Sequence, residues 1–307
     1  MGKKIAVLIL NYNTYEKTKN CIISCQKQKG ETFDLYVIDN FSSDDSLNKL
    51  KKEFVNGVEF IENRENYGYA KGNNIAVAYA LNKGYKYSFL LNSDTTLNGD
   101  LLIDNLFKII SEKENCAIIA PNIYNVTKEG LQLNKNDSGY LKLLRAFRIL
   151  GKNKQYNDKL VETSEAHGAA LFVNNHIFLE LGGFPEHYFM YGEESSLCKK
   201  TVINGYKILW EKDENNYVLH HHDETESKDE WREFLKGRNM LLSYYEQRKI
   251  APVRWYLIIF FLVLKVYLKN DRPRINGFKE ARKLVKSKSS KEQMFNNAVL
   301  MKEKLEI

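Results

Sequence analysis

Short apolar runs separated by amphipathic stretches dominate the first 120 residues. Uninterrupted apolar runs of this length predict strands that are buried on both faces of a parallel sheet. The expected strands cover residues 5–10, 33–38, 58–61, 85–91 and 116–120. Between them, apolar positions three and four apart predict helices over residues 14–29, 43–54, 75–81 and 101–110. This alternation predicts an α/β fold with a mostly parallel central sheet flanked by helices.

Each of the first four expected strands is followed by an amide or a carboxylate. These residues are Asn11, Asp39, Asn66 and Asp94. In a sheet of this kind, ligands bind outside the carboxyl ends of the strands. One such residue is unremarkable, whereas four that converge on one edge predict a binding site there.

The stretch LLNSDT, which contains Asp94, has two interpretations. In the first, Asp94 faces a bound nucleotide diphosphate through a divalent cation. In the second, the polar residues only begin the helix 101–110, with Thr95, Thr96 or Asp100 as its N-cap. Taken by itself, the segment is more typical of the second arrangement.

The composition is that of an ordinary globular protein, with 43% hydrophobic and 28% charged residues in a chain of 307. The formal net charge is +7, but residues 265–291 carry ten Lys or Arg against two acidic residues. The rest of the chain is therefore close to neutral, and the basicity belongs to a tail. Four scattered cysteines and a start without a signal-peptide pattern predict a cytoplasmic protein.

Two later segments have open interpretations. Residues 122–165 are polar and irregular apart from a basic apolar patch at 141–150, which predicts an insertion or a loop that could close over a substrate. Residues 255–268 are apolar except for Lys265, and as a helix they would be about 21 Å long, short of the ~30 Å hydrocarbon core. The basic residues that follow predict a helix in the membrane interface. A helix buried against the domain, or a contact in a homo-oligomer, explains the segment equally well.

Six segments in order carry a resemblance to a known family. They are AVLILNYNTYEKTKNCIIS, YVIDNFSSDDS, NRENYGYAKGNN, LLNSDT, GAALFV and GGFPEHYFMYGEESSLC. Together they resemble glycosyltransferase family 2, and they are most similar to its bacterial rhamnosyltransferase-like branch, over roughly residues 4–245. The resemblance implies a GT-A fold, a nucleotide-sugar donor and inversion at the anomeric carbon. The GT-A domain would cover residues 1–225, and residues 226–307 would form a helical, basic, membrane-associating extension.

In this family the aspartate after the second strand hydrogen-bonds the pyrimidine base, which implies that role for Asp39. The turn after the first strand lines the nucleoside pocket, which implies contacts from Asn11, Tyr12, Asn13 and Thr14. A later loop approaches the base and ribose, which implies contacts from Asn66, Gly68, Gly72 and Asn73. Glycine lets a backbone come close to a ligand. Helix capping by Asn13 or Thr14, and simple turns at the glycines, remain open as structural roles.

The family's DxD motif corresponds to Asn92, Ser93 and Asp94, so the first carboxylate is replaced by an amide. Asp94 can still ligate Mg²⁺ or Mn²⁺, because these cations prefer oxygen ligands that they share with phosphates. One carboxylate fewer predicts weaker metal binding. Family members often use a histidine after a late strand as a ligand of the metal or diphosphate. His220 is the first choice for this role and His221 the second.

Glu193 and Glu194 align with the family's Glu-Asp pair, whose second member is the catalytic base, which implies that Glu194 is the base. Adjacent carboxylates also raise each other's pKa, which suits general-base work. Alternatively, the pair only begins the helix 195–203, whose N-terminus favours negative charge. Ser196 replaces an aspartate that is common in this motif, and nothing in the sequence explains the change. His167 is a candidate contact for the acceptor.

The resemblance implies an inverting transferase that moves rhamnose or another hexose from a dTDP- or UDP-sugar to a glycan or lipid-linked acceptor. It would serve cell-surface polysaccharide synthesis at the cytoplasmic face of the inner membrane. The departures at Asn92, Glu194 and Ser196 leave open a non-catalytic nucleotide-sugar-binding protein on the same fold. Nucleic-acid binding is disfavoured, because the basic tail lacks interleaved aromatic residues and a recognisable module.

Overall fold

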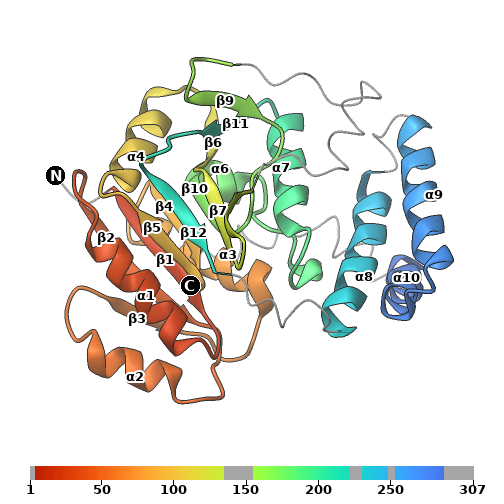
Figure 1. Cartoon of the computed structure of the whole chain (residues 1–307), viewed down its shortest axis with the longest axis horizontal. Coiled ribbons are helices and arrows are strands. Elements are labelled where there is room, and N and C mark those ends of the chain that lie inside the picture. Colours follow the sequence, from red (N-terminus) through yellow and green to blue (C-terminus); the bar gives the residue numbers. More distant parts are fainter. Residues whose placement is uncertain (1–3, 135–154, 222–229, 248–252, 287–307) are drawn as a thin grey trace.

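The computed structural model describes residues 4–134, 155–221, 230–247 and 253–286 (Figure 1). Its centre is an eight-stranded sheet in the order β3-β2-β1-β4-β10-β6-β11-β9. The strands are β1 (Ile5–Asn11), β2 (Phe33–Asp39), β3 (Glu59–Glu62), β4 (Tyr87–Asn92), β6 (Cys116–Ala120), β9 (Leu160–Thr163), β10 (Ala170–Asn174) and β11 (Lys207–Glu211). Strands β9 and β10 run antiparallel to their neighbours, and the remaining pairings are parallel. The expected α/β fold with a mostly parallel sheet is confirmed.

Helices cover both faces of this sheet. On one face lie α1 (Tyr15–Gln26), α2 (Ser46–Glu53) and α4 (Leu102–Glu112), and on the other α3 (Gly68–Asn82), α6 (Asn175–Glu180) and α7 (Glu193–Ile203). Strand β1 serves both cores: Ile5, Val7 and Ile9 pack on the first face, whereas Ala6 and Leu8 pack on the second. Successive strand side chains point to opposite faces, and each fully buried Ile or Leu contributes ~1.5–3 kcal/mol to stability.

Helix α3 begins seven residues earlier than expected, at Gly68. Gly72 and Asn73 therefore lie inside a helix, and their expected position in a loop is wrong. A Cβ on Gly72 would lie 2.9 Å from the end of the Leu10 side chain, so a larger residue there would displace Leu10 where α3 crosses β1. Asn73 is 2% exposed and donates to the Tyr69 carbonyl at 3.0 Å. Both residues are enclosed by protein contacts rather than presented at the edge of the sheet.

The chain after Asp94 forms a strand, β5 (Thr95–Asn98), and not a helix N-terminus. The N-cap position of α4 is Leu101, so the capping interpretation of LLNSDT is wrong. A second sheet in the order β5-β12-β7-β8 is completed by β7 (Ile123–Thr127), β8 (Gly130–Leu133) and β12 (Tyr217–His220). Its register pairs Thr95 with His220. This pairing brings the histidines beside Asp94.

The segment 122–165 contains regular structure where irregular chain was expected. Its described part includes β7, β8 and β9, and β9 extends the central sheet by pairing with β11. The polar sequence hides these strands because β8 and β9 lie at the edges of their sheets and most residues of β7 and β8 are not buried. The basic apolar patch 141–150, with the loop closure expected of it, lies outside the described residues.

Helices α8 (Glu230–Gln247), α9 (Val253–Leu268) and α10 (Arg272–Lys286) pack together at one side of the sheet domain (Figure 1). Helices α8 and α10 cross closely. A Cβ on Gly237 would lie only 2.5 Å from the carbonyl oxygen of Arg274, so glycine allows the two backbones to approach. A Cβ on Gly277 would likewise overlap the backbone of Phe234. Tyr188 of the sheet domain is fully buried among these three helices. None of the described helices has the length and apolar character that crossing a bilayer requires.

Glu211 ends β11 with a buried carboxyl group. It is 5% exposed, and its Oε2 has no hydrogen-bond partner among the described residues. Burial, followed by the negative charge of Asp213, raises the pKa of Glu211 from 4.5 to about 7, although Lys159 acts in the opposite direction. An ionised carboxylate at this position therefore destabilises the fold.

We expect Glu211→Gln to stabilise the protein at about pH 8.5 and to change little at about pH 4. Below the unfolded pKa the carboxyl is protonated in both states. Between 4.5 and about 7 only the unfolded state releases its proton, so wild-type stability falls as the pH rises. The full difference above this range is about 3 kcal/mol. Urea unfolding at both pH values measures it, with the exposed Glu114→Gln as control, and an equal gain at both would contradict the prediction.

Candidate functional site

Asp39 ends β2 with its carboxylate enclosed by hydrogen bonds. Asn11 Nδ2 donates to Asp39 Oδ1 at 2.7 Å, because the parallel register sets these residues opposite each other. The Ser42 hydroxyl donates to Oδ1 at 2.6 Å, and the Ser42 N–H donates to Oδ2 at 2.9 Å. A carboxylate accepts about four hydrogen bonds, so Oδ2 retains capacity for one more donor.

The turn after β1 ties the Asp39 side of this edge to the LLNSDT stretch. Asn13 Oδ1 accepts from the Ser43 N–H at 2.8 Å, and Thr14 Oγ1 donates to Ser93 Oγ at 3.0 Å. Tyr12 is exposed. Of the two expected capping residues, Asn13 and Thr14, Thr14 occupies the N-cap position of α1, but its side chain makes no capping hydrogen bond. Their polar groups instead bridge the ends of neighbouring strands, and the expected convergence of these ends is confirmed.

Asn66 and Gly68 lie where the chain enters α3. Asn66 Oδ1 accepts from Asn40 Nδ2 at 2.9 Å and from the Gly68 N–H at 3.0 Å. Gly68 has φ +72°, and a Cβ there would lie 2.5 Å from the Phe189 ring. Glycine is therefore required at this position by the approach of Phe189 as well as by the backbone conformation.

Asp94 and His220 face each other. His220 Nε2 lies 3.4 Å from Asp94 Oδ1, and its Nδ1 lies 3.3 Å from Asn125 Oδ1, a partner that orients the ring. His221 turns away, with Nε2 2.8 Å from the Thr96 hydroxyl. Carboxylate oxygen and imidazole nitrogen can share one divalent cation. Within the described residues no group of three His, Cys, Asp or Glu could hold a metal.

Helix α7 begins with the two glutamates, so the expected start of a helix at this pair is confirmed. Glu193 is 4% exposed, and its Oε2 has no hydrogen-bond partner among the described residues. Burial, and then the charge of Glu194, raises the pKa of Glu193 well above its usual range. Burial also raises the pKa of Glu194, which accepts from the Gly192 N–H at 3.1 Å. Burial is thus the main cause of both shifts, ahead of the expected mutual repulsion.

Tyr69 connects the glutamates with Asp94. Its hydroxyl donates to the Gly168 carbonyl at 2.5 Å, and a Cβ on Gly168 would lie 3.6 Å from the Glu194 side chain. Burial raises the pKa of Tyr69 well above its usual range, and the nearby charges of Glu193, Glu194 and Asp94 raise it further. Sequence reasoning misses Tyr69, although it lies inside the NRENYGYAKGNN segment. Tyr69 thus lies between the strand-end residues of the site and the glutamate pair.

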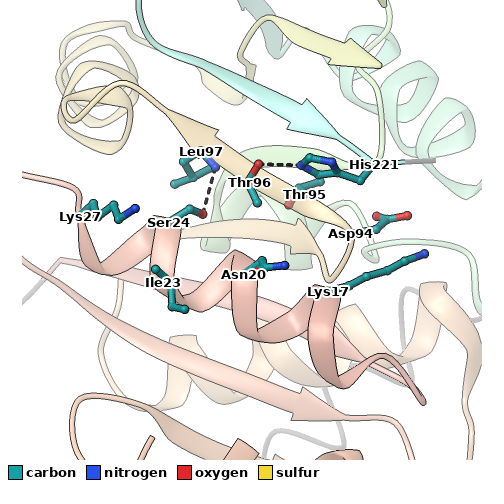
Figure 2. A pocket seen from close by; sticks show the side chains of 10 residues that line it. All are labelled: Lys17, Asn20, Ile23, Ser24, Lys27, Asp94, Thr95, Thr96, Leu97 and His221. Atoms are coloured by element: carbon teal, nitrogen blue, oxygen red, sulfur yellow. Dashed lines mark hydrogen bonds between the residues drawn. The ribbon is translucent and has the colours of Figure 1, made fainter. Parts of the chain in front are cut away.

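A pocket of about 490 Å³ opens between α1 and β5 beside Asp94 (Figure 2). Ser24 Oγ accepts from the Leu97 N–H at 3.0 Å and joins the helix to the strand. Lys17 extends from α1 toward Asp94, and His221 lies above them in Figure 2. Asp94 therefore borders this pocket as well as the row of strand ends.

Solved structures share this fold at low sequence identity. The chain aligns with GalNAc-T7, crystallised with UDP, GalNAc and Mn²⁺, at a TM-score of 0.61 and 15% identity, over 78% of this chain and 47% of that one. It aligns with residues 1–349 of S. aureus TarS, in complex with UDP-GlcNAc, at a TM-score of 0.59 and 15% identity, over 96% of this chain and 79% of that one. It aligns with PcManGT of Pyrobaculum calidifontis, in complex with GDP-Man and Mn²⁺, at a TM-score of 0.58 and 14% identity, over 97% of this chain and 80% of that one. These similarities show the GT-A fold.

Sequence comparison gives the family. A relative from Haloferax volcanii, the low-salt glycan biosynthesis hexosyltransferase Agl10, is 26% identical over 246 residues, which cover 78% of this chain and 75% of the relative. Residues 6–178, more than half of the chain, match Glycosyl transferase family 2. The chain therefore belongs to glycosyl transferase family 2.

Proposed function

We propose that this chain is an inverting glycosyltransferase that moves rhamnose or another hexose from a dTDP- or UDP-sugar to a glycan or lipid-linked acceptor. The placement of the glutamate pair beside the LLNSDT stretch carries the proposal: Glu194 lies beside Gly168, and the next residue, Ala169, accepts from the Asn92 N–H at 3.0 Å. Inverting transfer needs a base for the acceptor and stabilisation of the leaving diphosphate, and the carboxylates of Glu194 and Asp94 suit the two tasks. The UDP-GlcNAc bound to TarS, the GDP-Man bound to PcManGT and the hexosyltransferase name of Agl10 support a nucleotide-hexose donor.

The donor would lie along the row of strand ends. The remaining acceptor capacity of Asp39 Oδ2 suits one ring N–H of a pyrimidine base. Asp94 and His220 would hold Mg²⁺ or Mn²⁺, which supplies charge neutralisation of the departing diphosphate when it is bound. Asn92 Oδ1 is buried without a hydrogen-bond partner among the described residues, which supports a bound group at this edge because buried polar atoms are normally paired.

Glu194 would act as the base on the acceptor side. Burial raises the pKa of both glutamates, so the pair retains a proton. We assign the ionised state to Glu194, because the Gly192 N–H donates to it, whereas Glu193 Oε2 has no hydrogen-bond partner among the described residues. Ionised Glu194 takes the proton of the acceptor hydroxyl while that oxygen forms its bond to the anomeric carbon. The bond from that carbon to the diphosphate breaks on the opposite face, and the electron pair leaves with the diphosphate. The raised pKa brings the base closer to the operating pH.

We expect Glu194→Gln to lower kcat by at least ~10²-fold, because an amide cannot accept the proton, while donor affinity stays near that of wild type. Glu193→Gln is the matched control, since the amide resembles the protonated acid, and it should retain most of the activity. Release of nucleoside diphosphate from dTDP-rhamnose, UDP-glucose, UDP-galactose and UDP-GlcNAc, with a glycolipid extract as acceptor, measures turnover. Wild-type turnover in Glu194→Gln would show that the base is another residue.

The non-catalytic alternative has its own outcome in the same panel. A donor that binds the folded state raises Tm whether or not it is consumed. A Tm increase with a donor that is never consumed, with or without acceptor and Mn²⁺, would favour a nucleotide-sugar-binding protein over the transferase.

Metal binding is expected to depend on Asp94 and His220. Asp94→Asn and His220→Ala should each weaken Mn²⁺ binding in the presence of UDP by about tenfold or more, because each removes one protein ligand. His221→Ala should change it little, since His221 Nε2 is engaged by Thr96. Electron paramagnetic resonance of Mn²⁺ gives the affinity without requiring turnover. A loss confined to His221→Ala would reverse the assignment of the histidines.

The exposed face of α9 supports a membrane-held acceptor. Its exposed apolar side chains are Phe260, Phe261, Leu264, Tyr267 and Leu268. Exposed basic residues continue along α10 at Arg272, Lys279, Arg282, Lys283 and Lys286. An apolar face beside positive charge suits the interface of an anionic bilayer. We therefore propose that these helices bind the cytoplasmic face of the inner membrane.

Replacing both Phe260 and Phe261 by Ser should weaken binding to vesicles of phosphatidylcholine with phosphatidylglycerol by about tenfold or more, because apolar area is lost from the buried face. Val55→Ser is the control, since Val55 is 74% exposed but lies in the sheet domain. Co-sedimentation measures vesicle binding. Binding that is unchanged in the double variant would contradict the membrane proposal, and a dimeric mass that this variant abolishes would assign the face to a homo-oligomer.

A further inference from the structure

The segment leading into the glutamate pair has a strained backbone. Phe189 has φ 65° and ψ −61°, and Tyr191 and Gly192 also have positive φ values of 70° and 97°. The Met190 N–H donates to the Tyr188 carbonyl at 2.8 Å, which closes a three-residue turn around Phe189. At residues other than glycine such conformations cost about 1–3 kcal/mol each, and they persist only where surrounding contacts hold them. The segment ends directly at Glu193, so its shape sets how α7 begins.

Asn239 of α8 holds this turn from one side. The residue is 2% exposed. Its Nδ2 lies 2.7 Å from the carbonyl oxygens of Met190 and Tyr191, and 3.1 Å from that of Tyr188. Carbonyl oxygens only accept, so three of them around one atom fix that atom as the amide nitrogen. A carboxylate or an apolar side chain could not make these contacts.

Arg238 completes the contact and orients Asn239. Its Nε donates to Asn239 Oδ1 at 2.9 Å, and its Nη2 donates to the carbonyls of Tyr188 at 2.6 Å and His187 at 3.2 Å. The carbonyl of Phe189 accepts from the Ala70 N–H of α3 at 3.1 Å. All five carbonyls from 187 to 191 are thus engaged, four of them by two adjacent side chains of α8.

The position of α8 is set in turn by α10. The close crossing at Gly237 and Gly277 leaves no space for a side chain between these helices. Tyr188 inserts into the shared core beside Leu242 of α8 and Phe278 of α10. The turn before the glutamates is therefore anchored in the C-terminal helices by its ring as well as by its backbone.

We propose that Asn239 and Arg238 are positioning residues that hold the backbone of residues 187–192 so that Glu194 faces the reacting centre. This inference rests on the proposed role of Glu194 as the base. It implies that the C-terminal helices matter more for turnover than for donor binding. The candidate donor contacts Asp39 and Asp94 lie at the end of β2 and between β4 and β5, and the turn reaches the donor side through Phe189, which packs against Gly68.

The decisive variant is Asn239→Asp, which keeps the shape of the side chain but removes its donors. We expect kcat to fall by about tenfold or more while the donor KM changes less than about twofold. Amide hydrogen exchange in residues 189–194 should be at least about tenfold faster, because the turn loses its anchors. The acid limb of the kcat profile should move to lower pH, since Glu194 owes its raised pKa to burial. Glu230→Gln, at an exposed position at the start of the same helix, should change none of these quantities.

Arg238→Lys serves where Asn239→Asp fails to fold, as circular dichroism and Tm would reveal. Lysine keeps the positive charge but not the fork that reaches Asn239 and two carbonyls, so intermediate changes in kcat and exchange are expected. A lower Tm with unchanged kcat and pH profile would reduce both residues to a structural role and overturn the proposal. Unchanged exchange in a folded Asn239→Asp would do the same. Amide hydrogen exchange can be measured without turnover, so it tests the positioning role by itself. A wild-type protein that consumes no donor sugar would refute the proposed function and not the anchoring of the turn.

Discussion

The parallel pairing of β1 with β2 and β4 is the constraint on which the candidate site depends. Its register sets Asn11 opposite Asp39 and Leu10 opposite Asn92. All three strands run in one direction, so the Asp39 carboxylate and the LLNSDT stretch end at the same edge. A slip of one residue would exchange the Ile and Val side chains on one face of β1 with Ala6 and Leu8 on the other, so close packing in the two cores holds this register. The hydrophobic core thereby positions polar residues that could not converge by their own attraction.

The second half of the site comes from later strands that pair antiparallel to this frame. Strand β12 pairs with β5 and carries His220 to Asp94, and β10 pairs with β4 just after Gly168 meets Tyr69. At the start of α7 nearby, Glu193 is buried, and its Oε2 lacks a partner among the described residues. Burying a carboxyl group in this way reduces stability. The fold tolerates it because the two cores beside the sheet supply most of the stabilisation.

The C-terminal helices are part of the same arrangement. Their glycine crossing draws α8 and α10 together, their core receives Tyr188, and Asn239 engages the backbone just before α7. A strained turn at this place is stable because several groups constrain it at once. The exposed apolar face of α9 belongs to the same three helices. The C-terminal helices therefore carry the candidate membrane contact and also contact the turn that precedes the glutamate pair of α7.

The sequence by itself determined the alternation of strands and helices, the family, and the row of Asn11, Asp39 and Asp94. Apolar runs and motif order are local, and strand ends in a parallel sheet share one edge. It misplaced Gly72, because a glycine in a motif resembles a loop, whereas here it makes room for Leu10. Only the tertiary structure decided that Tyr69 lies among three carboxylates, that His220 rather than His221 faces Asp94, and that α8 holds the turn before Glu193. These features are contacts between residues far apart in the chain, and their geometry exists only after the sheets and helices have packed.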